Sequence, residues 1–193
     1  MVQNKLVANA RNGLGEDPLE IRIDTSKFRT MTRLLFVCMG NICRSPMAEG
    51  VFSVLAQQAG ISSSIDVDSA GTHANHEGEQ PDQRARKVAA VRGYDLTGLR
   101  ARRVKEQDFY RFDLILVMDR QNLDYLRRFC PAACLPKLHL FLEFADSFTS
   151  DEIPDPYYGG IEGFEKVLDL CEIAARGLIA AISGPGLGGK AGT

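Results

Sequence analysis

The sequence predicts an α/β fold, a three-layer sandwich in which a four-stranded parallel sheet carries helices on both faces. Short, continuously apolar runs recur along the chain, as expected for strands that are buried on both faces. Segments with the helical spacing of apolar residues alternate with these runs, and that alternation favours a parallel sheet. Chemically reactive residues follow the runs, at the carboxyl ends of strands, where sheets of this kind place their sites.

Composition and charge exclude several classes of protein. The 193 residues, 45% hydrophobic and 25% charged, fit one globular domain with a substantial core. The net charge of −2 argues against bulk binding to nucleic acid or to an acidic membrane surface. No apolar stretch approaches the roughly 18 residues of a transmembrane helix, so no membrane span is expected.

The cysteines and the chain ends suggest the compartment and the domain limits. The five cysteines are odd in number and irregular in spacing, which does not fit a disulfide-stabilised scaffold. Residues 1–32 lack the continuous apolar segment of a secretory signal, so we expect a cytoplasmic protein. We interpret residues 1–32 as a poorly ordered extension, 33–183 as the folded domain, and the glycine-rich residues 184–193 as a disordered tail.

Four apolar runs are expected to form the strands of the sheet, at residues 34–38, 65–69, 113–118 and 138–142. Five segments with helical periodicity are expected to form helices, at residues 45–59, 83–92, 105–109, 122–129 and 163–183. Pro46 suits the first turn of the first helix, and Gly60 stands where that helix should end. Asp82 is a suitable N-cap for the second helix, which Gly93 closes.

Functional side chains stand at the carboxyl ends of these expected strands. Cys38, Ser69 and Asp119 each end or follow a strand, and Asp155 lies in the long loop at 143–160 after the fourth strand. Long loops inside a compact domain are often functional. Because the carboxyl ends of parallel strands share one edge of the sheet, we expect these residues to gather there.

The segment from Cys38 to Arg44 has the composition of an anion-binding loop. A helix N-terminus and a guanidinium both stabilise a thiolate, and Cys38 is expected to have both as neighbours. The loop amides can form a nest around an anion, Gly40 eases the turn, and the Arg44 fork fits two phosphate oxygens. A Walker loop is excluded because it needs a lysine that this segment lacks. Taken alone, Cys38 could also be a buried structural cysteine.

Asp155, which lies between Pro154 and Pro156, is the candidate general acid. A phenol leaving group has a pKa near ~10, so its departure is faster when a carboxylic acid protonates it. The two prolines restrict the backbone and so fix the direction of the carboxyl group. The same residues are also typical of an acidic surface turn, which is the alternative interpretation.

Four segments, in this order, resemble the low-molecular-weight protein tyrosine phosphatases: VCMGNICRSP (37–46), DSAGT (68–72), VMD (117–119) and DPYYG (155–159). The resemblance covers about residues 33–182. It implies the flavodoxin-like phosphotyrosine phosphatase I fold. It also implies hydrolysis of phosphotyrosine and aryl phosphate monoesters through a cysteinyl-phosphate intermediate, with no metal and no cofactor. The implied partner is a phosphotyrosine protein, with a tyrosine kinase among the candidates, and the implied state is a monomer or weak dimer.

The resemblance also implies roles for individual residues. Cys38 is the expected nucleophile, Arg44 the clamp for the phosphate and the transition state, and Asp155 the acid and then the base. Ser69 and Asp119 are expected to support the site, with a helix cap as the alternative interpretation of Asp119. The expected substrate-binding residues belong to the first loop and to the pocket rim: Met39, Gly40, Asn41, Ile42, Cys43, Ser45, Tyr157 and Tyr158.

Two positions depart from the family pattern. Leu99 stands where many relatives have a histidine, so the network that holds the loop must be rebuilt or weaker. Asn75 stands where many relatives have an aromatic wall, so phosphotyrosine preference is less firmly implied than phosphatase chemistry. The family pattern also implies that Cys43 forms a reversible disulfide with Cys38, with a space-filling role as the alternative.

Three alternative functions remain. An arsenate reductase of the same fold needs two further cysteines, one of them just after the third strand, whereas Cys130 and Cys134 lie beyond that place. A protein-arginine phosphatase of the same fold carries a small polar residue at the position of Ile42. The third alternative is a non-catalytic phosphotyrosine-binding module, against which the intact nucleophile, arginine and acid argue.

Overall fold

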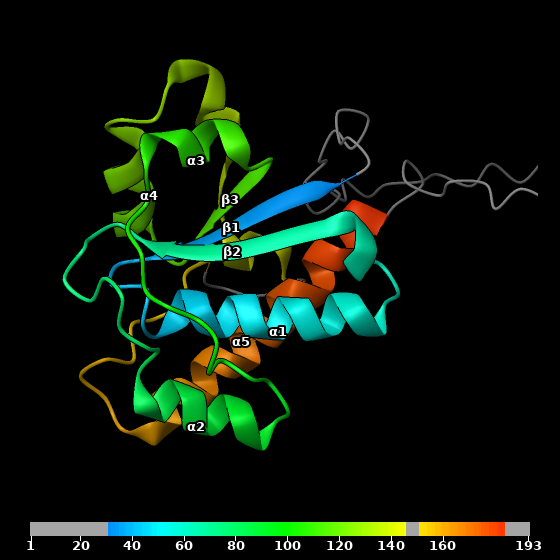
Figure 1. The fold of residues 1–193 in the computed structure, drawn as a ribbon, viewed down its shortest axis with the longest axis vertical. Coiled ribbons are helices and arrows are strands. Elements are labelled where there is room, and N and C mark those ends of the chain that lie inside the picture. Colours follow the sequence, from blue (N-terminus) through cyan, green and yellow to red (C-terminus); the bar gives the residue numbers. More distant parts are fainter. Residues whose placement is uncertain (1–30, 146–150, 184–193) are drawn as a thin grey trace, which may run out of the picture.

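The computed structural model describes residues 31–145 and 151–183, which form an α/β sandwich around one parallel sheet (Figure 1). The strands are β1 (Thr32–Cys38), β2 (Ile65–Gly71), β3 (Leu114–Val117) and β4 (Leu138–Leu140). They lie in the order β2-β1-β3-β4, and every pairing is parallel. The predicted fold class is therefore confirmed. The expected tail at 184–193, and all but two residues of the expected extension at 1–32, lie outside the described residues.

Strand β1 lies inside the sheet, and its side chains divide the core into two layers. Leu34 and Phe36 belong to one hydrophobic cluster, whereas Leu35 and Val37 belong to the other. All four side chains are fully buried. This alternation is the period-two geometry of a strand that is covered on both faces. Burial of each such side chain contributes about 1.5–3 kcal/mol to folding.

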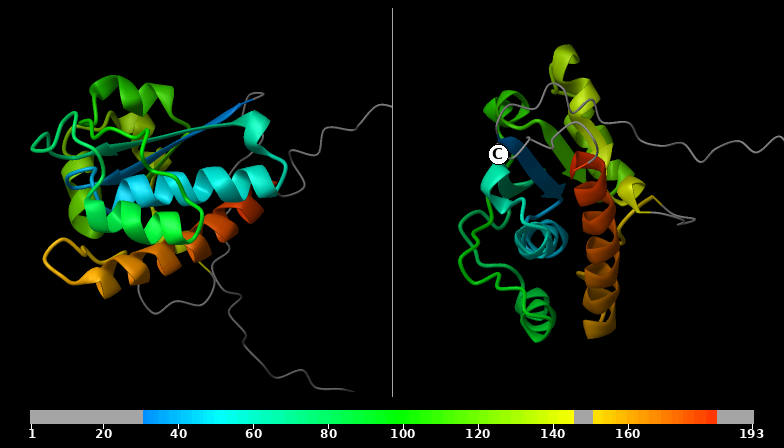
Figure 2. Two further views of the ribbon diagram at one scale, coloured as in Figure 1. Left: turned by 60° about the horizontal axis from the view of Figure 1, so that its bottom comes forward. Right: turned by 90° about the vertical axis from the view of Figure 1, so that its right-hand side faces the viewer.

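Helices cover both faces of the sheet. Helices α1 (Arg44–Gln58) and α5 (Ile161–Ser183) pack on the face that Phe36 occupies, and α2 (Gln83–Val91) packs outside them (Figures 1 and 2). Helices α3 (Glu106–Arg111) and α4 (Arg120–Arg127) lie on the other face. Helices α1 and α4 both begin at the carboxyl edge of the sheet, after β1 and β3. No helix in the described ranges combines the length and apolar character needed to cross a membrane.

The sequence does not predict three short 3-10 helices, η2 (Ser62–Ser64), η3 (Ala132–Lys137) and η4 (Phe141–Phe144). The last corrects the fourth strand, which was expected to reach residue 142 but ends at Leu140. Phe141, Leu142 and Phe144 all enter the same core cluster, which a strand could not achieve because it alternates between faces. Helix α4 begins two residues earlier than the expected 122–129 because Asp119 is its N-cap.

Gly177 allows α5 to lie against η4. A Cβ atom at this position would stand 1.7 Å from the carbonyl oxygen of Phe144, so the backbone of α5 or η4 would have to move. We therefore expect Gly177→Ala to lower the free energy of unfolding by about 3 kcal/mol, despite the higher helix propensity of alanine. Equilibrium unfolding in urea measures this change.

Gly163, in the same helix, is the matched control. A Cβ atom there would meet only Pro156, at an ordinary contact distance of 3.4 Å. Gly163→Ala should therefore be neutral or stabilise the fold by up to about 1 kcal/mol. Equal unfolding midpoints for the two alanine variants would contradict the proposed close approach.

Candidate active site

The loop between β1 and α1 is a closed cradle with Cys38 at its base. Loop carbonyls accept hydrogen bonds of 2.7–3.0 Å from the backbone amides of three residues outside the loop: Thr72, His73 and Asp82. The amide of Asn41 instead points inward and donates to Cys38 Sγ at 3.3 Å. A Cβ on Gly71 would lie 2.7 Å from the carbonyl oxygen of Met39, so glycine is needed where β2 ends against the loop. The cradle is thus anchored from outside and directs an amide at the sulfur.

Asn41 is the hub of the hydrogen bonds behind the loop. Its φ of 56° lies in the left-handed region, which asparagine adopts more often than most residues. Its Nδ2 donates to Ser45 Oγ at 2.9 Å and to Ser69 Oγ at 2.8 Å. Ser45 Oγ in turn lies 3.1 Å from Cys38 Sγ. The Asn41 side chain therefore connects Cys38, through Ser45, to Ser69 in β2.

Arg102 completes this network, although the basic run at 100–103 is most simply interpreted from the sequence as a solvated surface. Its backbone amide donates to Asn41 Oδ1 at 2.9 Å. Its guanidinium is fixed by ion pairs with Asp68 at 2.8 Å and Asp108 at 2.9 Å. Leu99, which stands where many relatives have histidine, is half-buried and packs against the core cluster. The network is thus rebuilt through a backbone donor, which side-chain patterns do not reveal.

Arg44 is buried, with 2% of its surface exposed, and its guanidinium joins three segments of the chain. Its Nη1 donates to Asp119 Oδ2 at 2.5 Å and to the carbonyl oxygen of Ile153 at 3.1 Å, and Nη2 donates to Asp155 Oδ2 at 2.6 Å. Burial lowers the pKa of Arg44, but the negative groups around it, Cys38 first, outweigh burial and raise that pKa. Its Nε is buried without a hydrogen-bond partner among the described residues, so it is available to an anion's oxygen.

Asp119 has two partners. Its Oδ2 binds Arg44, while its Oδ1 accepts a hydrogen bond of 2.7 Å from the backbone amide of Asn122 and caps α4. The sequence left a helix cap and a site anchor as alternatives for this residue. The structure shows both interactions, so the start of α4 is tied directly to the guanidinium.

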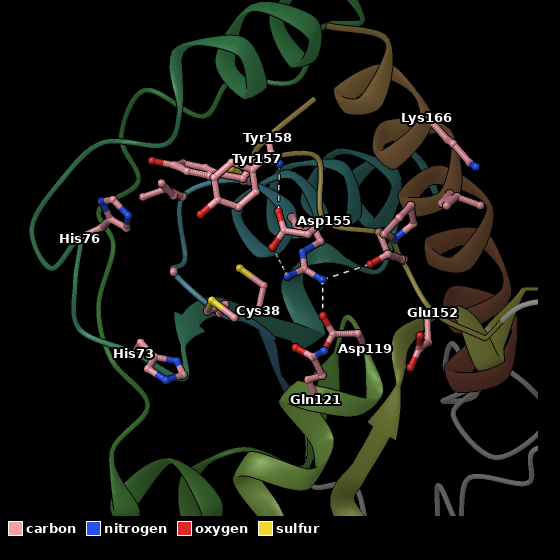
Figure 3. A pocket seen from close by; sticks show the side chains of 18 of the residues that line it. Cys38, His73, His76, Asp119, Gln121, Glu152, Asp155, Tyr157, Tyr158 and Lys166 are labelled. Atoms are coloured by element: carbon pink, nitrogen blue, oxygen red, sulfur yellow. Dashed lines mark hydrogen bonds and ion pairs between the residues drawn. The ribbon is translucent and has the colours of Figure 1, made fainter. Parts of the chain in front are cut away.

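Asp155 lines a cavity of about 950 Å³ that opens above Cys38 (Figure 3). Its Oδ1 accepts a hydrogen bond of 3.0 Å from the backbone amide of Tyr157, and its Oδ2 is held by Arg44. The side chain is 42% exposed, so it borders both the cradle and the solvent. A carboxyl group in this place can exchange protons with water and with a group bound over the sulfur.

Aromatic rings form one wall of the cavity. The rings of Tyr157 and Tyr158 pack edge to face, with centroids 5.1 Å apart. His76 lies on the other side of Tyr157, at 6.4 Å between ring centroids. Asn75, which was expected to replace the aromatic wall of many relatives, lines the cavity together with His76. The imidazole of His76 thus contributes a flat surface near Asn75, the position at which the aromatic wall of many relatives is missing.

The structure brings together all the residues that the sequence assigned to the site. Most of them line the cavity itself: Cys38, Met39, Gly40, Ile42, Cys43, Arg44, Asp119, Asp155, Tyr157 and Tyr158. The remainder, Asn41, Ser45 and Ser69, are buried behind the loop. The sequence analysis missed further lining residues, which come from separate segments without a shared motif: His73, His76, Gln121, Leu142, Glu152, Ile153, Lys166 and Leu170.

Cys43 is buried next to the nucleophile candidate. Burial is the main cause that raises the pKa of the Cys43 thiol, and the charge of Cys38 raises it further. Both cysteines are free thiols, so the Cys38–Cys43 disulfide implied by the resemblance stays a prediction. Cys134 belongs to the opposite core cluster, with Cys130 packed against it, and neither lines the cavity. Within the described residues no group of three or more His, Cys, Asp or Glu is placed to hold a metal ion.

Glu49, on α1, is expected to make stability depend on pH. Burial raises the pKa of Glu49 from 4.5 to about 7, Asp68 adds to this effect, and a hydrogen bond with Ser69 opposes it. Between these two values the folded protein binds a proton that the unfolded chain has released. The free energy of unfolding should therefore fall as pH rises through this window.

We expect Glu49→Gln to remove most of that pH dependence. The amide keeps the size of the carboxylic acid but does not ionise, so the variant should be more stable by about 2 kcal/mol near pH ~8 and little changed near pH ~5. Urea unfolding at both pH values measures the difference. An identical loss of stability with pH in wild type and variant would show that another group titrates.

Comparison with known proteins places this geometry in a family. The family model of the low molecular weight phosphotyrosine protein phosphatases matches residues 33–185. The chain belongs to this family. It is therefore an enzyme of the protein-tyrosine-phosphatase class, as the sequence predicted.

Individual relatives agree with this assignment. A low molecular weight protein-tyrosine-phosphatase of Streptomyces coelicolor is 42% identical over 153 residues, which are 78% of this chain and 93% of that protein. The Homo sapiens low molecular weight phosphotyrosine protein phosphatase is 38% identical over 148 residues, 76% of this chain and 92% of that protein. The crystal structure of a protein tyrosine phosphatase from Entamoeba histolytica has a TM-score of 0.77 at 42% identity, with 79% of this chain and 97% of that chain covered.

Proposed function

We propose that the protein hydrolyses phosphotyrosine in protein substrates through a cysteinyl-phosphate intermediate on Cys38. The observation that supports this proposal most strongly is the arrangement around one sulfur atom. Cys38 Sγ lies under the amide of Asn41, and the buried Arg44 binds Asp155 through Nη2 while its Nε has no hydrogen-bond partner among the described residues. The cradle therefore supplies a nucleophile, anion-binding donors and an acid within a single cavity.

The first step transfers the phosphoryl group to sulfur. The Cys38 thiolate attacks phosphorus, an S–P bond forms, and the bond between phosphorus and the phenolic oxygen breaks. The electron pair leaves on that oxygen, which takes a proton from Asp155 as tyrosine departs. Inward amides and the Arg44 guanidinium stabilise the charge on the three equatorial oxygens.

The second step returns the enzyme to its starting state. Asp155, now a carboxylate, removes a proton from a water molecule, whose oxygen attacks phosphorus. An O–P bond forms, the S–P bond breaks, and inorganic phosphate leaves. Ser45, 3.1 Å from Cys38 Sγ, donates a hydrogen bond that stabilises the departing thiolate.

Arg44 couples substrate binding to a change at Asp155, the proposed general acid. In the structure, Nη2 of Arg44 binds Asp155, so acid and clamp hold each other before a substrate is bound. A phosphate dianion offers the guanidinium two oxygens at once and competes with that single carboxylate contact. We infer that substrate binding frees the Asp155 carboxyl to face the leaving oxygen, while Asp119 keeps hold of Nη1.

The proposed substrate is an aryl rather than a guanidinium phosphate. Ile42 lines the cavity as a bulky, nearly buried side chain, whereas arginine phosphatases of this fold carry a small polar residue there. Tyr157 and His76 offer flat surfaces on which a phenyl ring can stack. Arsenate reduction is disfavoured because Cys130 and Cys134 do not line the cavity. Hydrolysis assays with phosphoarginine, and with arsenate plus thioredoxin, test these two alternatives.

We expect Asp155→Asn to lower kcat for phosphotyrosine-peptide hydrolysis by about 100- to 1,000-fold, because asparagine cannot protonate the leaving phenolate. The loss should be smaller for p-nitrophenyl phosphate, whose leaving group is more acidic and needs less protonation. Steady-state assays on both substrates measure this difference. An equal loss on both would show that Asp155 acts by holding Arg44 rather than as the acid.

The remaining proposals concern partners and location. A tyrosine kinase that carries phosphotyrosine is the candidate substrate protein, and a reducing cytoplasm would keep the Cys38 thiol available. A monomer or weak dimer is the expected state in solution. Sedimentation analysis over a range of protein concentrations tests that expectation.

A further inference from the structure

A second hollow opens beside the active-site cavity, next to α4. It is smaller than that cavity, about 280 Å³ in volume, and three of its lining residues, Met39, His73 and Gln121, also line the active-site cavity. Met39 is 44% exposed and lies between the two. Figure 3 shows His73 and Gln121 on the side of Cys38 away from Tyr157. The two hollows are therefore contiguous, and one bound chain could occupy both.

The floor of the second hollow is built from packed rings. The His73 ring lies against Tyr125, with centroids 5.0 Å apart, and Tyr125 packs edge to face on Phe129 at 5.2 Å. His73 Nδ1 is also held by the hydroxyl of Thr72 at 2.8 Å. These contacts fix the shape of the hollow before any ligand binds, which reduces the entropy lost on binding.

Two exposed arginines border this floor. Arg128 lines the hollow directly, and Arg103 donates a hydrogen bond of 2.9 Å from Nη2 to Tyr125 Oη. Across residues 31–145 and 151–183, neither guanidinium has a carboxylate partner within ion-pair distance. Exposed arginines elsewhere on the molecule, such as Arg92 and Arg120, do pair with acids.

The acidic groups near the mouth are already paired. Among the described residues that line the second hollow, Asp124 is the only carboxylate, and it lies 3.6 Å from Arg127. On the opposite flank, Asp151 and Glu152 form ion pairs with Arg120. The hollow therefore offers unpaired positive charge on one side of the active site, which gives a bound peptide a preferred direction.

We propose that this basic hollow, lined by His73, Tyr125 and Arg128 and bordered by Arg103, binds an anionic side chain close in sequence to the phosphotyrosine of the substrate. The inference rests on the proposed phosphotyrosine phosphatase function. An extended peptide advances about 3.3 Å per residue, so neighbours of the phosphotyrosine reach a contiguous hollow. Guanidinium forks bind carboxylates and phosphoryl groups bidentately, and both belong to the ligand chemistry that fits here.

The test compares phosphotyrosine peptides that differ at one flanking position. Each position within about three residues of the phosphotyrosine carries, in turn, glutamine, glutamate or phosphoserine. We expect wild type to show a kcat/KM about three- to tenfold higher for the anionic peptides on one side of the phosphotyrosine, and less preference in high salt. Glutamate and phosphoserine peptides show which anion the hollow prefers.

Variants locate the preference. In Arg128→Gln, and more fully in Arg128→Gln with Arg103→Gln, the ratio of kcat/KM for the anionic and glutamine peptides should fall towards one. Lys87→Gln is the matched control, because Lys87 is an exposed cation on α2 that lines neither hollow. It should keep the ratio of wild type. The ratio is taken within each variant, so a change in overall folding or rate does not alter it.

Several results would overturn the proposal. Wild type that hydrolyses all phosphotyrosine peptides equally well would exclude the hollow as a subsite and leave the phosphatase function standing. The preference for anionic peptides would have its origin outside the hollow if it persisted in the double variant that lacks both arginines. The same conclusion would follow if Lys87→Gln reduced the preference as much as the double variant does. If wild type hydrolyses no phosphotyrosine peptide, the proposed function and the subsite fail together.

Discussion

Cys38→Ser is expected to reduce the hydrolysis of phosphotyrosine peptides by at least about 10,000-fold. Serine keeps the size of the side chain and the neighbours of Sγ, which are the Asn41 amide and Ser45 Oγ. Its hydroxyl, however, stays protonated at neutral pH, and the described groups that contact Sγ, an amide and a hydroxyl, do not provide a base. Asp155 cannot act as that base, because the first step requires it as the protonated acid. The variant should therefore bind substrate without turning it over.

The matching control is Cys130→Ser, a half-buried cysteine of the opposite core cluster that does not line the cavity. It should retain turnover within about twofold, since it contacts none of the reacting groups. Calorimetric titration of Cys38→Ser with a phosphotyrosine peptide measures the retained binding. Substantial turnover by Cys38→Ser would show that another residue attacks phosphorus.

Arg44→Lys is expected to cost about 1,000-fold or more in kcat/KM, although the positive charge is kept. The guanidinium makes separate bonds to Asp119, the Ile153 carbonyl and Asp155, and still has Nε for a phosphate oxygen. An ammonium group cannot match this planar set of donors. We expect both a higher KM and a lower kcat, because the clamp acts on the bound phosphate and on the transition state.

The folding state of Arg44→Lys needs a separate measurement, because removal of buried donors leaves Asp119 and Ile153 partly unsatisfied. Near-ultraviolet circular dichroism and urea unfolding report on this. Asp119→Asn is a useful companion, since it perturbs the same buried contact from the other side while Arg44 stays in place. A lysine variant that is folded and nearly fully active would exclude Arg44 as the phosphate clamp.

The sequence predicted the central features of the site because they follow from sheet topology. Cys38 and Asp119 end or follow strands that pair in parallel, so they had to meet at one edge of the sheet. The flanking prolines of Asp155 are equally typical of a surface turn, so its assignment as the acid depended on the first loop and on the family resemblance. The side chain of Arg44 reaches both acids, as expected for a clamp at a helix start.

Other features depend on backbone atoms and could not be read from side-chain patterns. The Ile153 carbonyl accepts a hydrogen bond from Arg44, and the Arg102 amide donates one to Asn41. Both are backbone groups, so residue types do not reveal these contacts. The 3-10 helix that begins at Phe141 places Phe141, Leu142 and Phe144 in one core cluster. This local structure is determined by tertiary packing rather than by the local sequence pattern. His76 approaches Tyr157 only because two separate loops fold over the same cavity.

The central claim is that the phosphoryl group passes through Cys38. Wild-type enzyme mixed rapidly with a phosphotyrosine peptide labelled in the phosphate, then quenched with acid, tests it most directly. We predict a transient cysteinyl phosphate on Cys38, which mass spectrometry of the digested wild-type protein should detect and which should be absent from Cys38→Ser. Full turnover with no label on the protein, or with the label on another residue, would contradict the mechanism.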